Sequence, residues 1–127
     1  MDYKVIIAGS RTLQKLNMVE VGMSKIGLPT SKISYVISGN ASGVDRLGEA
    51  WAKRHAIKIK KYPANWEKFG RSAGYKRNEL MSRIADVLVA FWDGKSKGTE
   101  HMIKIAREKK LSVIIYKIID GNKLRRI

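Results

Sequence analysis

The sequence contains no cysteine, only two prolines and few acidic residues. The absence of cysteine excludes disulfide bonds, thiolate zinc sites and a cysteine nucleophile. No apolar run approaches the roughly 20 residues that a helix needs to cross a bilayer, and the first residues look like a strand rather than a signal peptide. We therefore expect a cytoplasmic protein with no membrane partner. The two histidines, His55 and His101, lack a second ligand at metal spacing, so we predict no metal site and no cofactor.

The residues that are present make a strongly basic chain. Lysine and arginine number 26 against 11 acidic residues, which gives a formal net charge of +15 over 127 residues. Such a charge favours a phosphorylated or polyanionic partner, including nucleic acid, but a lysine-rich soluble surface explains it equally well. A hydrophobic content of 44% suffices for one core. We expect a single domain over residues 1–119, followed by a short basic tail over residues 120–127.

Short apolar runs alternate with stretches of helical periodicity. The runs cover residues 5–8, 35–37, 57–59, 87–92 and 113–116. Four are nearly continuous, as in strands buried on both faces, whereas Ile57 and Ile59 alternate with lysines, which suits an edge strand. The helical stripes are Leu16, Val19, Met23 and Ile26; Val44, Leu47, Trp51 and His55; Leu80, Met81 and Ile84; and Met102, Ile103 and Ala106.

This alternation predicts an α/β fold. We expect a single Rossmann-like, doubly wound domain with a five-stranded, mostly parallel sheet in the order 3-2-1-4-5 and helices on both faces. In such sheets ligands bind beyond the carboxyl ends of the strands. The loops that follow the predicted strands are therefore the place to look for chemistry.

Two of these loops pass through glycines into a predicted helix, at Gly39–Gly43 and Gly94–Thr99. Glycine lets backbone N–H groups approach an anion closely, and a helix N-terminus adds roughly half a unit of positive charge. Both loops are thus candidate phosphate cradles, to which Ser42 and Thr99 would add hydroxyl groups. The alternative is that the glycines only form tight turns and that Thr99 caps a helix. Neither G-x-G-x-x-G nor G-x-x-x-x-G-K-[ST] is present.

Cationic, aromatic and acidic residues lie near the same edge. Arginine can grip a phosphate with two parallel hydrogen bonds. Trp66 follows a proline-containing loop, where it either stacks on a base, at about 1–3 kcal/mol, or closes the end of a helix. The predicted ligand-binding residues are Gly9, Ser10, Arg11, Gly39, Ser42, Gly43, Asp45, Arg77, Asn78, Gly94, Gly98 and Thr99, with Asn65 and Trp66 as base or sugar contacts.

Three carboxylates, Asp45, Asp93 and Glu100, are candidates for acid–base work. Asp45 and Glu100 are explained equally well as acidic residues in the first turn of a helix, where the helix dipole favours them. The residue that would carry out catalysis therefore stays unknown at this stage, as does whether the protein is an enzyme.

Taken together, the loops resemble the YspA/YpsA-related SLOG family. The resemblance rests on G-S-R-T, S-G-N-A-S-G-V-D, P-A-N-W, G-R-S-A-G-Y-K-R-N-E-L-M and A-D-V-L-V-A-F-W-D-G-K-S-K-G-T, and it spans residues 3–116. It implies a Rossmann-like fold, a pocket for nucleotides or nucleotide-derived ligands, and a homo-oligomer in which neighbouring chains complete the pocket.

The wider superfamily includes the LOG phosphoribohydrolases and the DNA-binding DprA proteins. In LOG enzymes an arginine–lysine pair precedes a P-G-G-x-G-T-x-x-E loop. Arg77 matches that arginine, while Asn78 replaces the lysine. Gly94, Gly98 and Thr99 match the glycine–threonine loop, but Met102 stands at the position of the glutamate. Glu100 is two residues out of register, which on a helix turns it about 200° away. These departures argue against hydrolysis and leave phosphate binding intact.

The leading hypothesis is therefore a protein that binds a nucleotide or a nucleotide-derived ligand as a sensor, carrier or sequestering protein. One alternative is an enzyme that hydrolyses the N-glycosidic bond of a nucleoside monophosphate. Another is a DprA-like module for single-stranded nucleic acid, which rests on the net charge. A stable domain whose pocket has decayed is the remaining possibility.

Overall fold

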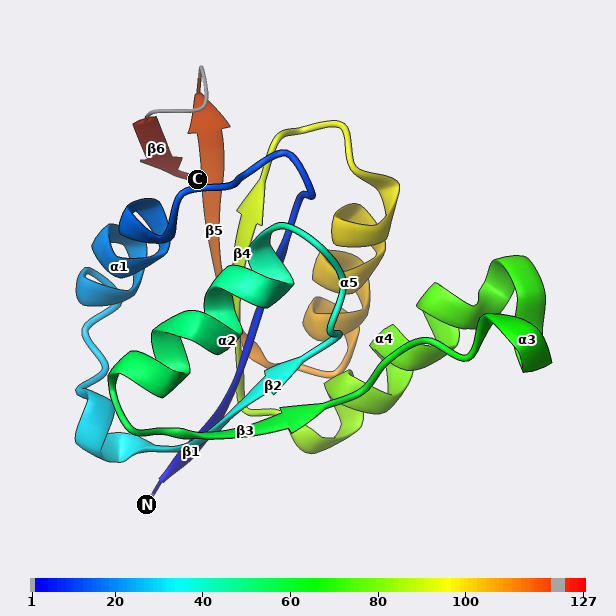
Figure 1. Ribbon diagram of the computed structural model, residues 1–127, viewed down its shortest axis with the longest axis horizontal. Coiled ribbons are helices and arrows are strands. Elements are labelled where there is room, and N and C mark those ends of the chain that lie inside the picture. The colour runs from blue at the N-terminus through cyan, green and yellow to red at the C-terminus, as the bar shows by residue number, and fades with distance from the viewer. Residues whose placement is uncertain (1, 120–122) are drawn as a thin grey trace.

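A six-stranded sheet, in the order β3-β2-β1-β4-β5-β6, forms the middle layer of the computed structural model (Figure 1). The structure describes residues 2–119 and 123–127. The strands are β1 (Tyr3–Gly9), β2 (Ile33–Ser38), β3 (Lys58–Lys61), β4 (Val87–Trp92), β5 (Ser112–Ile119) and β6 (Lys123–Arg126). The helices are α1 (Leu16–Ser24), α2 (Val44–Arg54), α3 (Trp66–Phe69), α4 (Ala73–Ile84) and α5 (Lys97–Glu108), with 3-10 turns η1 (Thr30–Lys32) and η2 (Gly70–Ser72).

The predicted Rossmann-like α/β class is confirmed, and so is the order of its first five strands. All pairs among β1 to β5 are parallel, and β3 lies at the edge, as the lysines around Ile59 indicated. The parallel pairing brings the carboxyl ends of the strands, and the loops that follow them, to one side of the sheet.

The sheet has a sixth strand that the sequence analysis did not predict. Residues expected as a basic tail include β6, which pairs antiparallel with β5, Leu124 lying opposite Ile118. Leu124 packs against the core on the side of α1, so one apolar side chain anchors an otherwise basic strand. Its isolation among charged residues explains why no strand pattern is visible there. Residues 120–122 of the expected tail lie outside the described residues.

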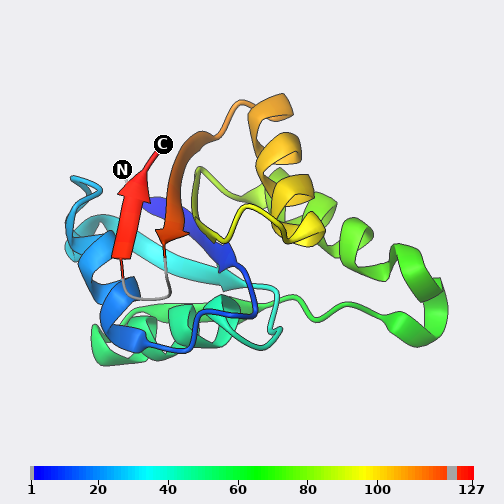
Figure 2. The same ribbon diagram turned by 90° about the horizontal axis from the view of Figure 1, so that it is seen from above.

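Alternate residues of the central strand β1 point into two separate cores. Val5 and Ile7 belong to the core beneath α1 and α2, whereas Ile6 and Ala8 belong to the core beneath α4 and α5. Viewed from above, the two pairs of helices lie on opposite sides of the sheet (Figure 2). The continuous apolar character of β1 is therefore the mark of a strand buried on both faces.

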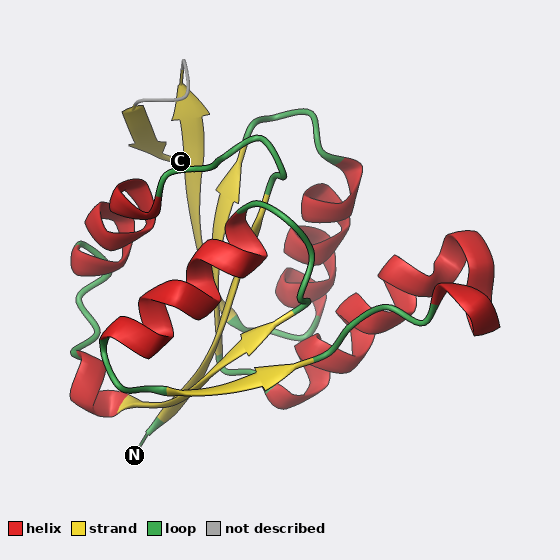
Figure 3. Ribbon diagram, in the orientation of Figure 1, coloured by secondary structure: helices red, strands yellow, loops and turns green. Residues whose placement is uncertain are grey.

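Helix α4 departs from the predicted arrangement. The stripe that included Leu80 was expected to be buried, but Leu80 is 51% exposed, while Asn78, Met81 and Ser82 are buried. The helix packs mainly against α5, and its N-terminal half projects beyond the sheet together with α3 and η2 (Figure 3). We call residues 62–75 the arm. Within residues 2–119 and 123–127, no helix combines the length and the apolar character needed to cross a membrane.

Candidate functional site

Two adjoining cavities lie at the carboxyl ends of the parallel strands, where the sequence analysis placed the site. The first has a volume of about 310 Å³ and lies between the end of β1, the arm and the N-terminal part of α5. The second, of about 410 Å³, lies beside the loop that follows β2. Arg11, Arg77, Trp66 and Ala41 line both cavities, so the two cavities meet at a pair of arginines.

Arg77 is fixed at this junction by contacts to two segments. Its Nη1 donates a hydrogen bond to the carbonyl oxygen of Gly39, 2.5 Å away, and its Nε donates to Oδ1 of Asn78 at 3.1 Å. A Cβ on Gly39 would lie 2.4 Å from the same Nη1, so only glycine leaves room for the guanidinium. Burial lowers the pKa of Arg77, although the nearby Asp45 partly opposes that shift. Arginine stays charged in proteins regardless.

Asp45 is a carboxylic acid buried in the same place, 7% exposed in the first turn of α2. Its Oδ2 accepts a hydrogen bond from the backbone N–H of Ala41 at 3.2 Å. Burial raises the pKa of Asp45 to about 6, with the negative charge of Glu49 adding to the rise and Arg77 and Arg11 opposing it. A carboxyl group that titrates near neutral pH beside a cavity is a common feature of functional sites.

Asn78 connects helix α4 to the N-terminal turn of α5. Its Nδ2 donates to the carbonyl oxygen of Gly98 at 3.2 Å and lies 3.1 Å from Nδ1 of His101. The ring of Tyr75 lies against the ring of His101, with 4.2 Å between their centroids. Because the amide of Asn78 is used in these contacts and in its bond to Arg77, its role is to position Arg77 and the start of α5 relative to each other.

The first turn of α5 faces the first cavity through Ser96, Gly98 and Thr99. Ser96 caps the helix, its Oγ accepting from the amide of Thr99. The preceding amides of Lys95 and Ser96 both donate to Asp93 Oδ1 at 2.8 Å. Burial by itself would raise the pKa of Asp93, but these amide bonds and hydrogen bonds from the side-chain hydroxyl groups of Ser10 and Thr12 hold it below its usual value. Asp93 therefore occupies part of the predicted cradle, and Ser96, Gly98 and Thr99 are the residues of this segment that line the cavity.

The loop from Gly39 to Gly43 is held mainly by contacts within the protein. The amide of Asn40 donates to Ser38 Oγ, and the amide of Ala41 is bound by Asp45. Gly43 adopts a φ of 79°, and a Cβ there would lie 2.5 Å from the Cα of Arg11. Gly43 thus permits close packing of this loop on the backbone that follows β1. Ser42 lines the second cavity.

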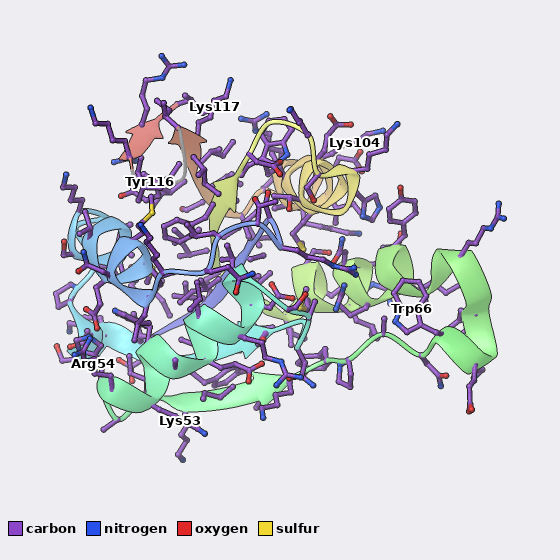
Figure 4. The ribbon with its side chains drawn as sticks, turned by 45° about the horizontal axis from the view of Figure 1, so that its top comes forward. Lys53, Arg54, Trp66, Lys104, Tyr116 and Lys117 are labelled. Carbon is purple, nitrogen blue, oxygen red and sulfur yellow. The ribbon has the colours of Figure 1, made fainter. Side chains whose placement is uncertain are left out.

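Two aromatic side chains border the first cavity. Trp66, 55% exposed, and Tyr75 both line it from the arm. Figure 4 shows the indole of Trp66 between the loop that leads into α3 and helix α4. A Cβ built on Gly74 would lie 3.6 Å from the tip of the indole and 3.9 Å from Nη2 of Arg77. The sequence left open whether Trp66 would be available to stack on a base or would close the end of a helix. The observed indole is exposed, which leaves its ring available for stacking.

Comparison with known proteins identifies the family. The family model described as YspA, cpYpsA-related SLOG family matches residues 3–69, which is more than half of the chain. The chain belongs to this SLOG family. The curated "Gene 61 protein" of Mycobacterium phage D29 is 32% identical over 123 residues, covering 87% of this chain and 94% of the phage protein. No solved structure matches the chain.

Most of the residues predicted for this SLOG protein are brought together. Those that line the first cavity are Gly9, Arg11, Asp45, Trp66, Arg77, Asn78, Gly98 and Thr99, and those that line the second include Gly39 and Ser42. The family model itself ends at residue 69, so α4 and α5, which supply Arg77 and Thr99, come from beyond the matched segment.

Other predicted residues are not in the described lining of either cavity: Ser10, Gly43, Gly94, Asn65, Asp93 and Glu100. Ser10 is buried and its Oγ accepts from the amide of Asp93. Asn65 caps α3, its Oδ1 accepting from the amide of Lys68. Glu100 lines a different, apolar groove beside Trp92 and Ile127. Of the three carboxylates considered as catalytic candidates, Asp45 is the one that the described residues place in the lining of these two cavities.

Several lining residues, Arg71 and Asn40 among them, were not predicted as site residues, and Tyr75 and Ser96 are two further examples. Tyr75 directly follows Gly74 in the arm, and Ser96 is the N-cap residue directly before α5. Both residues lie inside motifs that carry the family resemblance, and this was the one feature of the sequence that could have marked them as site residues. The position of Tyr75 at the cavity depends on how far α4 projects, which the periodicity of a single helix does not specify.

Proposed function

We propose that the first cavity binds a nucleotide or a nucleotide-derived ligand, as part of a sensor, carrier or sequestering protein. The observation that carries the proposal is the convergence of Arg11, Arg77 and the first turn of α5 on one cavity bordered by two aromatic rings. A phosphate group is the ligand chemistry that arginines and helix N-termini share. Membership of the SLOG family is consistent with such a role.

The phosphate would lie between the guanidinium groups and the amides of Lys97 and Gly98, because the amide of Thr99 already donates to Ser96 Oγ. Helix α5 has 12 residues, long enough for its dipole to favour an anion at its N-terminus. Asn78 holds Gly98 and Arg77 in fixed relation, so the two sources of positive potential are preorganised toward one point. Preorganisation reduces the entropy lost on binding.

The base would lie against the aromatic side of the cavity. Trp66 and Tyr75 present exposed ring surface there, while Met81 and Met102 form a buried apolar floor. Stacking of a base on an aromatic ring contributes about 1–3 kcal/mol and tolerates different bases. The arrangement therefore supports a nucleoside phosphate more than inorganic phosphate alone.

Calorimetric titration with the nucleoside 5′-monophosphates and diphosphates tests this proposal. We expect at least one of them to bind to the wild-type protein and Arg77→Gln to weaken that binding by about 1.5–3 kcal/mol, the range for hydrogen bonds to charged groups. Arg83→Gln is the matched control, because Arg83 is exposed at the far end of the same helix. Equal affinities in the two variants would refute the assignment of the phosphate to Arg77.

A second candidate function is hydrolysis of the N-glycosidic bond of a bound nucleotide, and Asp45 is the observation that favours it. Its pKa of about 6 makes both protonation states available near neutral pH. As the neutral acid, Asp45 would give its proton to the departing base; as the carboxylate, it would accept a proton from the water that attacks the sugar carbon. In either case the products are the free base and the sugar phosphate.

Incubation with the nucleoside monophosphates, followed by chromatographic detection of free base, tests this second function. We expect Asp45→Asn to abolish base release while retaining nucleotide binding, since the amide preserves the shape of the carboxyl group. Glu100→Gln serves as the control, because Glu100 faces a different groove. Absence of free base with every nucleotide, at enzyme concentrations that bind them, would exclude hydrolysis and leave the binding function in place.

A further inference from the structure

The side-chain amide of Asn78 has its orientation fixed by two partners. Its Oδ1 accepts a hydrogen bond from Nε of Arg77 at 3.1 Å, and its Nδ2 donates to the carbonyl oxygen of Gly98 at 3.2 Å. A guanidinium N–H can only donate and a carbonyl oxygen can only accept. Turning the amide over would therefore set donor against donor and acceptor against acceptor at the same time, so one orientation satisfies both partners.

This orientation determines which nitrogen of His101 carries a proton. Nδ2 of Asn78 lies 3.1 Å from Nδ1 of His101, and because an amide nitrogen can only donate, Nδ1 has to be the acceptor. The imidazole is then neutral, with its proton on Nε2. A proton on Nδ1 would set two donors 3.1 Å apart, so the amide of Asn78 would have to move.

The contacts of Asn78 carry such a movement to the proposed anion site. Asn78 is buried, and it borders the first cavity together with Arg77 and Gly98. A shift of its amide would leave Nε of Arg77 without an acceptor and would release the hydrogen bond between α4 and the first turn of α5. Both sources of positive potential at the site therefore depend on His101 remaining an acceptor.

The surroundings of His101 favour its neutral form at pH 7. The ring is partly buried, and that of Tyr75, from α4, lies against it with 4.2 Å between the centroids. Burial lowers the pKa of His101 below its ordinary value of 6.5. The positive charge of Lys104 adds to that shift, whereas the carboxylates of Glu79 and Glu108 oppose it. Protonation of the ring therefore takes place on the acid side of pH 6.5.

We propose that His101 is a positioning residue whose protonation, acting through Asn78, releases Arg77 and weakens the binding of an anion. It contacts no ligand itself, since it lies outside the described lining of both cavities. This inference rests on the proposed nucleotide-binding function and concerns the regulation of that site. It gives the site an acid-sensitive affinity, with the sign opposite to that of a histidine whose positive charge attracts the phosphate directly.

The first test uses the protein without a ligand. NMR of the imidazole nitrogens should show the Nε2–H form of His101 at pH 7.5. On acidification, the signals of the Asn78 side-chain amide and of the Arg77 Nε–H should shift with the midpoint of the His101 ring. His101→Asn supplies an amide oxygen that can accept at every pH, and it should remove that component of both shifts. Asp45, with a pKa of about 6, titrates in both proteins, so the difference between them belongs to His101.

The second test measures affinity for ADP, UDP and GDP by calorimetry at pH 7.5 and at one pH unit below the measured midpoint of His101. His101→Asn should match the wild type at pH 7.5 and bind about threefold to tenfold more tightly at the lower pH, the equivalent of one hydrogen bond. His101→Phe keeps a ring against Tyr75 without an acceptor, so it should bind weakly at both. His55→Asn is the control, because His55 lies beside Glu20 and outside the lining of both cavities.

The outcomes separate the inference from the proposed function. An Nδ1–H form of His101 at pH 7.5, or Asn78 and Arg77 signals that do not follow its titration, would overturn the inference without involving a ligand. Nucleotide binding in which wild type and His101→Asn keep the same affinity ratio at both pH values would overturn it and leave the binding function intact. Failure of all three nucleotides to bind would remove the proposed function and the affinity claim with it, whereas the titration of the free protein still decides the coupling of His101 to Arg77.

Discussion

The guanidinium of Arg77 donates a hydrogen bond to the carbonyl oxygen of Gly39 over 2.5 Å, which joins helix α4 to the loop after β2. The two residues are 38 positions apart in the chain, and neither can be changed without affecting the other, because the space that a side chain at position 39 would fill is taken by Nη1 of Arg77. This contact sets the direction of the charge at the junction of the two cavities.

Gly39→Ala should therefore weaken nucleotide binding without unfolding the protein. The added Cβ would lie 2.4 Å from the flexible end of Arg77 and 2.8 Å from Asp45 Oδ2, so the guanidinium would move rather than the backbone. We expect an affinity loss of about 1–2 kcal/mol in calorimetric titration, comparable to loss of a hydrogen bond to a charged group. Gly27→Ala is the control, since a Cβ there meets nothing within 4 Å and Gly27 is not in the lining of either cavity. Equal affinities for the two variants would show that the contact is not important for binding.

Replacement of Trp66 should affect binding much more than stability. The indole is 55% exposed, so Trp66→Ala removes little buried surface from the fold. We expect it to cost about 1–3 kcal/mol of nucleotide affinity through lost stacking, and Trp66→Phe to restore most of that loss. Phe69→Ala is the matched control on the same short helix, because Phe69 is exposed and lies outside the described lining of both cavities. An effect of Phe69→Ala as large as that of Trp66→Ala would point to the arm as a whole rather than to the indole.

The buried carboxyl group of Asp45 predicts a particular dependence of stability on pH. Its pKa rises from 3.8 to about 6 on folding, so between these values the native state binds more protons than the unfolded state. Stability from this group is complete below pH 4 and falls as the pH rises through 6. Asp45→Asn removes that loss, and its stabilising effect in urea denaturation should be about 2 kcal/mol greater at pH 8 than at pH 4.5.

The comparison between variant and wild type isolates Asp45 from the other acidic groups, which change equally in both proteins. A difference that does not grow between pH 4.5 and pH 8 would mean that the Asp45 carboxyl group keeps its ordinary pKa in the folded protein.

Gly43→Ala should destabilise the fold more than Gly27→Ala does. Both glycines have a left-handed backbone, with φ of 79° and 77°. A Cβ at Gly27 meets nothing within 4 Å, whereas one at Gly43 would lie 2.5 Å from the Cα of Arg11 and 2.7 Å from the carbonyl oxygen of Ser10. Gly27→Ala should cost about 1–2 kcal/mol from backbone strain alone, and Gly43→Ala should cost more, as measured by urea denaturation. Similar losses would contradict the close packing of the loop against Arg11.

Much of the fold could be predicted because each strand carries its own signal. The apolar run around Val5 and Ile7 is continuous because both faces of β1 are covered, and the lysines beside Ile59 mark an edge. Strand β6 could not be predicted, because Leu124 is its one apolar residue that packs against the core and the other residues of the strand are charged. The exposure of Leu80 was also missed, because packing of α4 on α5 decides it rather than helical periodicity.

The site could be predicted as a region more reliably than residue by residue. Parallel strands bring the loops after them to one edge, so Arg11, Asp45, Arg77 and Thr99 were found together. A loop amide can bind a ligand only if no acceptor within the protein already takes its hydrogen bond, and the contacts of nearby side chains decide this. Asp93 binds the amides of its own loop, and no pattern in the sequence separates that role from catalysis.

The central claim is that a nucleotide phosphate binds between Arg77 and the first turn of α5. Two-dimensional NMR of the ¹⁵N-labelled protein, titrated with the nucleoside 5′-monophosphates and diphosphates, tests it most directly. We predict shifts of the amide signals of Arg11, Gly98 and Thr99, and of the Arg77 side-chain Nε–H. Shifts confined to the lysines of β3 and the basic residues of β6, or no shift with any compound, would contradict the account.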